Sequence, residues 1–465
     1  MNYALKHLKK NKIIYSIILL FFFFKLLTFS YYKTIWWDSA VYIGMGKYIY
    51  SLGNSGLWED SRPIVWPLML GFFWKIKLNP IFSGRILEII FGSFCILLTY
   101  MIGDKVFNRK AAVLSSLFLA FSPAFFFFVG IMLTEIVSTC FVLLGVYFII
   151  KKRYFFSGIF FGLAFMSRFL QLLAFAAVFL LLSVYSRKTK TKNLIKLIAG
   201  FGMVIIPFLI LNQFLYNNML FPFLQQFLLS RNSGWGNFQP ISFYFIELFR
   251  ENIFYLIFVA GLVLAIRDKD INKKLIASVF VVFFIFFNSI EQKEMRFIII
   301  LIPYMCLLMS YLIIKIFDKL KDAKIKNILI ALIILSLVLS GIDIISFYKT
   351  ESNKKNQYQT LQNKFQNIDI NNEVWVSNPV IPVLSNNKAD KLIYYPYFSR
   401  ENAESMIKNA GHADLIFLDS CDLACKLHDD KCEKTKTEFI SALKQKLSII
   451  YNSGADACEQ FIFKK

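Results

Sequence analysis

An acidic residue follows the first long apolar segment, in a position that suits chemistry at a membrane surface. Asp38 lies in the motif WWDSAVY, which begins at Trp36 and ends at Tyr42. At the start of a helix the dipole favours an ionised carboxylate, which could act as a general base. Asp is also among the best helix N-cap residues, so a structural cap is the alternative. A catalytic role for Asp38 therefore depends on polar partners elsewhere in the chain.

Two further charged residues interrupt apolar sequence. Glu135 follows Thr134 at the start of an apolar segment, where a carboxylate is costly and indicates a functional residue. Arg168 ends another apolar segment, and its guanidinium could hold a phosphate or pair with Glu135. A first-turn acid favoured by the helix dipole and a snorkelling arginine are the structural alternatives. We predict that Glu135 is catalytic together with Asp38, and that Arg168 binds phosphate.

The densest group of charges is the motif EQKEMRF at residues 291–297, between two apolar segments. Lys293 and Arg296 could share one helical face and offer two cations to a lipid phosphate. We predict that Glu294, which lies between them, binds substrate. A solvated turn is the alternative interpretation.

Two residues of the loop after the first apolar segment complete the candidate set. Arg62 lies in the polar break DSRP at residues 60–63 and could contact donor phosphate or acceptor. Ser-Arg-Pro also suits a simple turn between two helices. We predict that Tyr42 contributes to substrate binding.

Membrane spans are the elements that must position these residues. Hydrophobic residues make up 57% of the chain, Phe occurs 53 times, and the mean hydropathy is +0.55. A soluble protein could not hide so much apolar surface in one core. Polar breaks separate about eleven apolar segments, each approaching the ~20 residues that cross a ~30 Å hydrocarbon core. They lie near residues 13–30, 82–103, 111–128, 133–150, 154–167, 169–186, 194–213, 253–266, 275–290, 297–314 and 327–346.

Lysines and arginines indicate the orientation of these spans, because cytoplasmic loops hold the excess of basic residues. They cluster in alternate loops and at the N-terminus, which is therefore predicted to be cytoplasmic. The loops 31–81 and 214–252 and the tail after Phe347 are then extracytoplasmic, and the candidate residues gather on that face. The net charge of +22 forms no continuous basic stripe, so we expect no nucleic-acid partner. Lys25 and Glu88 are charged residues that fall inside apolar segments, and Lys25 is the one that the sequence explains least.

The extracytoplasmic regions are predicted to have structure of their own. Residues 40–52 and 65–76 have the pattern of helices that lie in the membrane interface. In the tail, strands are expected at 373–376, 391–395, 414–418 and 448–451, with helices at 400–409 and 434–446. This alternation favours a small, mostly parallel α/β domain. We predict a transmembrane domain over residues 1–346 and a soluble extracytoplasmic domain over residues 347–465.

Four cysteines lie close together in the tail. Cys421, Cys425, Cys432 and Cys458 surround His428, and Cys-x3-Cys-x2-His-x3-Cys could form a zinc site. An extracytoplasmic tail favours two disulfides instead. No pairing follows from the sequence.

The motifs together resemble the C-type (GT-C) glycosyltransferases. WWDSAVY, the downstream SRPIVWPLMLGFF, the Thr-Glu pair and the Ser-Arg pair resemble the branch of protein O-mannosyltransferases and lipid A aminoarabinose transferases. EQKEMRF resembles the H-K-E-x-R-F motif of mannosyltransferases that use dolichyl phosphate mannose. Gln292 replaces the family histidine, and Ser39 stands where many relatives have a second acid. The resemblance covers roughly residues 10–345 and its motifs are short.

The resemblance implies an inverting transferase that moves a sugar from a polyprenyl phosphate to an acceptor. The sugar would be mannose or another hexose or pentose, and the acceptor a hydroxyl or amine on a protein, lipid or glycan. Asp38 would deprotonate the acceptor, while Arg168, Lys293 and Arg296 would hold the phosphate. We expect no required cofactor, although a divalent metal is conceivable. A transporter or lipid flippase with an outward-facing charged cavity is the alternative, but it should carry charges at mid-membrane on broken helices.

Overall fold

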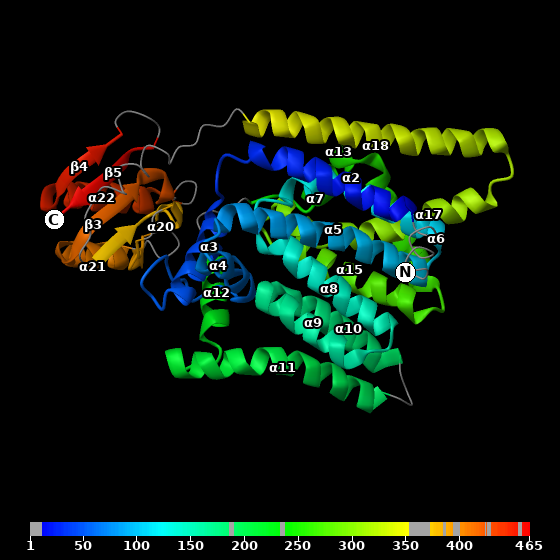
Figure 1. Cartoon of the computed structure of the whole chain (residues 1–465), viewed down its shortest axis with the longest axis horizontal. Helices are drawn as coiled ribbons and strands as arrows, with labels where there is room; N and C mark the ends of the chain where they lie inside the picture. Colours follow the sequence, from blue (N-terminus) through cyan, green and yellow to red (C-terminus); the bar gives the residue numbers. More distant parts are fainter. Residues whose placement is uncertain are drawn as a thin grey trace. The chain divides into compact units, whose positions relative to one another are not determined.

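The computed structural model describes residues 12–185, 190–232, 238–352, 373–384, 387–393, 400–423, 425, 429–453 and 458–465 (Figure 1). The chain forms two compact units. The first, here called the helical unit, contains Met1–Lys33, Gly84–Gln213 and Phe238–Lys354. The second, the loop–tail unit, contains Thr34–Ser83, Phe214–Asn237 and Lys355–Lys465. The predicted domain boundary between residues 346 and 347 stays a prediction.

Long apolar helices dominate the helical unit. Within the described residues, five helices are long and apolar enough to cross a membrane, and four shorter apolar helices accompany them. The long ones are α2 (Lys12–Thr28), α5 (Pro80–Val106), α11 (Lys190–Tyr216), α15 (Ile271–Ser289) and α18 (Ala323–Ser352). The shorter ones include α8 (Thr134–Ile150), α9 (Tyr154–Ser167), α10 (Leu172–Tyr185) and α14 (Phe258–Arg267). The protein is therefore an integral membrane protein, while the exact number of spans stays a prediction.

Two predicted segments are broken in the structure. The segment 111–128 divides into α6 (Arg109–Ala120) and α7 (Pro123–Phe128). Proline suits the first turn of a helix, and the Ser122 hydroxyl caps α7 by accepting from the amide of Phe125. The segment 297–314 likewise divides into α16 (Met295–Ile298) and α17 (Ile302–Lys319). These breaks create short turns at the ends of helices.

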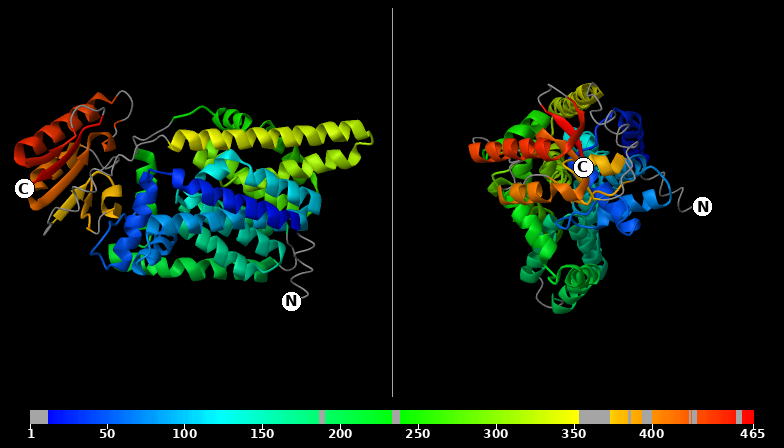
Figure 2. Two further views of the ribbon diagram at one scale, coloured as in Figure 1. Left: turned by 45° about the horizontal axis from the view of Figure 1, so that its top comes forward. Right: turned by 90° about the vertical axis from the view of Figure 1, so that its left-hand side faces the viewer.

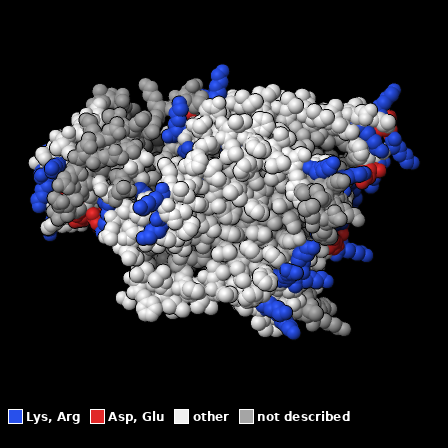
Figure 3. All heavy atoms as spheres, in the orientation of Figure 1, with Lys and Arg blue, Asp and Glu red and all other residues white. Residues whose placement is uncertain are grey.

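Close helix packing in this unit depends on small residues. A Cβ atom on Gly158 of α9 would lie 2.8 Å from the amide nitrogen of Phe201 in α11, and one on Gly261 of α14 would lie 2.7 Å from the carbonyl carbon of Leu308 in α17. Glycine lets helix backbones approach where lipid supplies no hydrophobic driving force. On the face seen in Figure 3, charged side chains leave a broad uncharged surface over the helices. Such a surface suits contact with lipid.

The loop–tail unit contains the two helices predicted for the first loop. These are α3 (Trp37–Tyr50) and α4 (Val65–Lys75). They pack closely, because a Cβ atom on Gly46 would lie only 2.8 Å from Cα of Gly71. A third helix of the unit is α12 (Phe221–Asn232). Both predicted helices are thus confirmed, and three of their four ends lie within two residues of the predicted positions.

A five-stranded sheet forms the rest of this unit, in the order β2-β1-β3-β5-β4. Its strands are β1 (Glu373–Val376), β2 (Lys391–Leu392), β3 (Ala413–Asp419), β4 (Ser448–Asn452) and β5 (Gln460–Lys464). β1 pairs in parallel with β2 and β3, whereas β5 is antiparallel to both β3 and β4. The expectation of a mostly parallel sheet was wrong, because it missed β5. Residues 394 and 395 of the predicted second strand lie outside the described residues.

Alternate residues of the strands face two different cores. Helices α21 (Arg400–Asn409) and α22 (Asp430–Lys446) lie beside the sheet (Figure 2). Trp375, Ile416 and Phe463 form one core with residues of these helices. Val374, Phe417 and Ile462 pack instead with Val41, Met45 and Leu57 of the first loop. Period-two alternation of strand side chains explains this division. The loop that carries Asp38 is therefore part of the core of the tail.

One buried cation strengthens this connection. The ammonium group of Lys47 in α3 donates to the carbonyls of Val383 (2.6 Å) and Pro382 (3.3 Å), at the end of α20 (Val380–Leu384). A cation at the carboxyl end of a helix is favoured by the helix dipole. Burial lowers the pKa of Lys47 from 10.5 to about 8.

Candidate functional site

Arg168 lies at the point where α9 ends, and its backbone is extended. Its Nη1 lies 3.0 Å from Oε1 of Glu135 and donates to the hydroxyl of Thr134 at 3.2 Å. The Glu135 side chain is 1% exposed and that of Arg168 is 18% exposed. The carboxylate therefore lies behind the guanidinium. This geometry supports a role for Glu135 in the orientation of Arg168.

Buried hydrogen bonds tie the two segments that carry this ion pair. The amide of Gln171 donates to the hydroxyl of Ser138 at 2.9 Å, and Ser138 donates to the carbonyl of Glu135 at 3.2 Å. Gln171 and Ser138 are both fully buried. Arg168 thus has neighbours that hold it in one arrangement. Gln171 lies one turn after Arg168, and we did not predict it from the sequence.

The EQKEMRF turn places Glu294 and Arg296 together. Glu294 is the residue before α16, and its Oε2 lies 2.6 Å from Nε of Arg296. The side-chain amide of Gln292 donates to Oε1 of Glu294 at 3.3 Å. Gln292 also forms an antiparallel bridge with Phe238. Gln292 therefore supports the Glu294 carboxylate.

Lys293 lies differently from the prediction. Helix α16 begins only at Met295, so Lys293 and Arg296 do not share a helical face. The Lys293 side chain is 2% exposed, and its ammonium donates to the carbonyls of Ile290 (2.5 Å) and Gln239 (3.0 Å). This arrangement anchors the turn to the segment after residue 237. The geometry thus leaves Arg296 as the cation of this turn that reaches the surface.

One aromatic ring connects the two ion pairs. The guanidinium carbons of Arg168 and Arg296 lie 5.7 and 5.3 Å from the ring centroid of Phe297. Both distances fall in the range of cation–π attraction. The ring of Phe297 is in turn stacked on that of Phe287 in α15, with centroids 5.7 Å apart. Residues 135, 168, 294 and 296, predicted from separate motifs, therefore form one cluster in the helical unit.

Asp38 belongs to a second cluster, in the loop–tail unit. Its Oδ1 lies 2.8 Å from Nη2 of Arg62, and Nε of Arg62 lies 3.1 Å from Oε1 of Glu59. Helix α3 begins at Trp37 and its N-cap is Trp36, so Asp38 is a first-turn residue rather than the cap. Arg62 joins two carboxylates, of which Glu59 was not predicted from the sequence. An acid three residues before Arg62 was the available signal.

The surroundings of Arg62 are largely buried. Its guanidinium carbon lies 5.7 Å from the ring centroid of Tyr42, which is 3% exposed. The hydroxyl of Ser61 donates to Glu59 at 3.0 Å. Burial and the charge of Glu59 raise the pKa of Asp60. Arg62 therefore supports the Asp38 carboxylate, and the Tyr42 ring lies beside the Arg62 guanidinium. The predicted contacts of Arg62 and Tyr42 with donor and substrate stay predictions.

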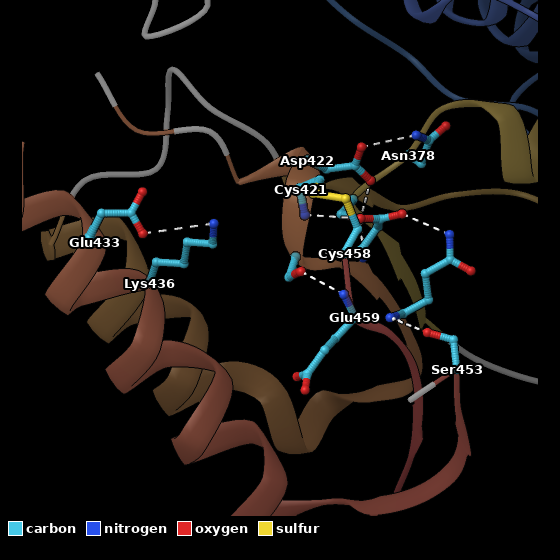
Figure 4. The surroundings of a disulfide bond; sticks show 12 residues. Asn378, Cys421, Asp422, Glu433, Lys436, Ser453, Cys458 and Glu459 are labelled. Carbon is cyan, nitrogen blue, oxygen red and sulfur yellow. Dashed lines mark hydrogen bonds and ion pairs between the residues drawn. A yellow bond between two sulfur atoms is a disulfide. The ribbon is translucent and has the colours of Figure 1, made fainter. Parts of the chain in front are cut away.

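The tail cysteines form two disulfides, Cys421–Cys458 and Cys425–Cys432. Cys421 follows β3, and Cys458 precedes β5 (Figure 4). Within the described residues, Asp419, Cys421 and Cys458 have ligand atoms close enough for a metal. A disulfide leaves these two sulfurs without the thiolates that metal binding requires. His428, which the zinc alternative needs, lies outside the described residues.

Next to this bridge, the carboxylate of Asp422 is buried in a polar cluster (Figure 4). It accepts from the hydroxyl of Ser377 at 2.7 Å and from the amide of Asn378 at 3.1 Å. Burial and the nearby Asp419 raise the pKa of Asp422 well above its ordinary value. These bonds join the ends of β1 and β3.

Comparison with known proteins defines the class. Residues 61–211 match the family described as dolichyl-phosphate-mannose-protein mannosyltransferase. No curated protein matches the sequence significantly. Among solved structures, ArnT from Cupriavidus metallidurans, bound to undecaprenyl phosphate, is similar with a TM-score of 0.67 and 10% identity over 98% of each chain.

Two other structures have the same fold. The archaeal oligosaccharyltransferase AglB from Archaeoglobus fulgidus, solved with an inhibitory peptide and a dolichol-phosphate, has a TM-score of 0.63 and 11% identity over 97% of this chain and 74% of its own. The mycobacterial arabinofuranosyltransferase AftD has a TM-score of 0.59 and 10% identity over 98% of this chain and 41% of its own. The chain therefore has the GT-C fold of membrane glycosyltransferases. The likeness of EQKEMRF to the H-K-E-x-R-F motif stays an expectation.

Proposed function

We propose that the protein is an inverting glycosyltransferase that uses a polyprenyl-phosphate sugar as donor. The observation that carries the proposal is the placement of Arg168 and Arg296 against one ring, within a GT-C fold. The solved structures of ArnT and AglB, which have a similar fold, contain undecaprenyl phosphate and a dolichol-phosphate. The sugar is mannose or another hexose or pentose, and the acceptor is a hydroxyl or amine of a protein, lipid or glycan.

In the proposed reaction, Arg168 and Arg296 bind the donor phosphate. When the bond between the anomeric carbon and the phosphate oxygen breaks, the leaving phosphate gains negative charge. Preorganised cations stabilise that charge more than they stabilise the bound donor, and this difference lowers the barrier. Glu135 and Glu294 keep the two guanidinium groups in place through their ion pairs.

Asp38 is the proposed general base. It removes the proton of the acceptor, whose oxygen or nitrogen then attacks the anomeric carbon from the side opposite the phosphate, so the configuration inverts. Arg62 and Glu59 hold the Asp38 carboxylate in one orientation. The mechanism requires no metal, and chelation by EDTA is expected to leave the transfer rate unchanged.

We further propose that the N-terminus is cytoplasmic and that the reaction occurs on the extracytoplasmic face. The distribution of basic residues along the sequence supports this orientation. The two disulfides of the tail support it as well, because disulfides persist outside the reducing cytoplasm.

The intramembrane charges argue against a transporter. The ammonium of Lys25 donates to the carbonyl of Phe126 and the hydroxyl of Tyr348, and the carboxylate of Glu88 accepts from two backbone amides. Both groups are fully buried and hold other parts of the protein. Charges along a transport path would instead face a water-filled cavity.

An assay in membranes tests the proposal. Membranes that contain the wild-type protein receive labelled dolichyl or undecaprenyl phosphate sugars, and membranes with Asp38→Asn serve as comparison. We expect label to become covalently attached to an acceptor only with the wild-type protein. Label that changes leaflet while still attached to its lipid would support a flippase, and undiminished transfer by a folded Asp38→Asn variant would exclude the assigned base.

A further inference from the structure

Glu88 is a buried carboxylate in the middle of the helical unit. It belongs to the apolar helix α5 and is fully buried. Its Oε2 accepts from the backbone amides of Gly130 (2.7 Å) and Met132 (2.6 Å). A buried carboxylate is costly unless it is hydrogen-bonded, and these two bonds satisfy one of its two oxygens.

The two amides belong to a turn with unusual backbone geometry. The turn connects α7, which ends at Phe128, with α8, which begins at Thr134. Gly130 has a φ of 105° and Met132 a φ of 70°, both in the left-handed region. A residue with a side chain adopts this conformation only where its surroundings enforce it. The Glu88 carboxylate restrains the turn, because it accepts hydrogen bonds from the amides on both sides of Ile131.

Other buried polar groups hold the residues just before this turn. The ammonium of Lys25 in α2 donates to the carbonyl of Phe126 at 2.8 Å and to the hydroxyl of Tyr348 in α18 at 2.7 Å. The hydroxyl of Tyr32 donates to the carbonyl of Phe127. Helices α2, α5 and α18 therefore all bind the segment 126–132. These hydrogen bonds explain why a charged residue, Lys25, lies within an apolar helix, which the sequence alone did not explain.

The turn leads directly into the candidate site. Only Leu133 separates Met132 from Thr134 and Glu135, and both of these residues contact Arg168. A change in the turn must therefore move the two groups that orient the guanidinium. A misplacement of about 1 Å can lower a reaction rate by about 100-fold.

We propose that Glu88 is a positioning residue for the Glu135–Arg168 pair, acting through the Gly130–Met132 turn. The inference rests on the proposed transferase function and deepens it. Glu88 contacts neither donor nor acceptor. Its role is to hold two amides, so any side chain of similar shape with an accepting oxygen should replace it.

The experiment compares Glu88→Gln, which keeps an accepting oxygen, with Glu88→Leu, which does not. In the membrane transfer assay we expect Glu88→Gln to stay within about threefold of the wild-type kcat, and Glu88→Leu to lose about 10-fold or more with little change in donor KM. Glu251→Leu is the matched control. Glu251 is also a buried carboxylate, but it binds Ser122 and the amide of Ala124 at the other end of α7.

A second pair of variants covers the case in which Glu88→Leu does not fold. Gly130→Ala strains the turn without touching Glu88, because a Cβ atom there has room but its φ is unfavourable. Gly53→Ala is the matched control, since Gly53 also has positive φ and equal room at another place. We expect a lower kcat for Gly130→Ala alone. Equal kcat values for these two variants would overturn the proposal.

Hydrogen exchange gives a readout that does not depend on activity. We expect the peptide that covers residues 126–133 to exchange faster in Glu88→Leu than in wild type or Glu251→Leu. Unchanged exchange, or equal loss of kcat in Glu88→Leu and Glu251→Leu, would overturn the positioning role. If the wild-type protein transfers no sugar but this exchange difference is present, the proposed function fails while the hold of Glu88 on the turn stands.

Discussion

Arg168 and Arg296 lie against the same aromatic ring, that of Phe297, although Arg168 directly follows α9 and Arg296 lies in α16. Each guanidinium also has its own carboxylate, which is Glu135 for Arg168 and Glu294 for Arg296. Two guanidinium groups so placed suit an anion with charge on several oxygens, such as a phosphate. The four residues come from three separate motifs.

Replacement of either arginine by lysine is expected to impair donor use. Arg168→Lys and Arg296→Lys should each lower kcat/KM for the polyprenyl-phosphate sugar by roughly 10- to 100-fold, because a lysine keeps the charge but loses the planar fork of donors. Transfer assays at several donor concentrations measure this effect. Arg250→Lys is the control, since Arg250 is 69% exposed and pairs only with Glu247 among the ion pairs of the described residues. Equal effects for all three variants would contradict the assignment.

Loss of the cation between the two acids of the first loop should change the pH dependence of transfer. In Arg62→Met, Asp38 and Glu59 lose the guanidinium that both contact. Their protonated forms are then favoured, so the acid limb of the profile of kcat/KM against pH should move to higher pH. The rate at pH 6 should fall more than the rate at pH 8. An Arg400→Met variant, which breaks an exposed ion pair with Glu404 in the same unit, should leave the profile unchanged.

Lys47 is expected to make the loop–tail unit more stable in alkaline solution. Its pKa is about 8 in the folded protein against 10.5 ordinarily, so between these values the unfolded state binds more protons than the folded state. Stability therefore rises with pH across this window, by up to about 3 kcal/mol for this group. The neutral amine still has two hydrogens for the carbonyls of Pro382 and Val383.

Thermal unfolding in detergent from pH 7.5 to 10.5 measures this effect, with Lys47→Met as comparison. The difference in melting temperature between wild type and Lys47→Met should change in favour of wild type as the pH rises. If the difference in melting temperature between the two proteins stays constant from pH 7.5 to 10.5, the pKa of Lys47 is not lowered by folding.

The tail cysteines should be oxidised in the mature protein. Without reductant, the tail cysteines should not react with maleimide after the membranes are denatured, because they are disulfide-bonded. Reduction should make all four reactive, namely Cys421, Cys425, Cys432 and Cys458. Loss of the Cys421–Cys458 bridge by Cys421→Ser should cost about 2–4 kcal/mol, because the bridge closes a loop of 37 residues. The buried thiols Cys95, Cys140 and Cys306 are the internal control, since they should react after denaturation alone. Full reaction of the tail thiols without reductant would place the tail in a reducing compartment.

Much of the fold follows from the sequence. The apolar segments, the helices α3 and α4 and the strands β1, β3 and β4 depend on local hydrophobic patterns, which single residues report directly. β5 escaped notice because its place in the sheet, between β3 and β4, depends on pairing with β3, a strand about 40 residues earlier in the chain. The breaks at residues 121–122 and 299–301 likewise lie within continuous apolar sequence, so hydropathy alone does not show them.

The candidate site divides in the same way. Asp38, Glu135, Arg168 and Arg296 could be recognised one by one, because a charge beside apolar sequence is costly and needs a reason. The roles of Lys293, Glu59 and Glu88 could not be recognised from the sequence. Each role depends on which atoms of other segments contact the side chain in the folded protein.

By itself, the sequence determined that this is a membrane protein with charged residues next to its spans. Only the tertiary structure decided that the loop with Asp38 packs into the core of the tail. It also decided that Arg168 and Arg296 both lie against the ring of Phe297. The physical reason is that hydrophobicity is a property of each segment, whereas an ion pair or a hydrogen bond requires two groups within about 3 Å of each other. That distance exists only when segments far apart in the chain have folded together.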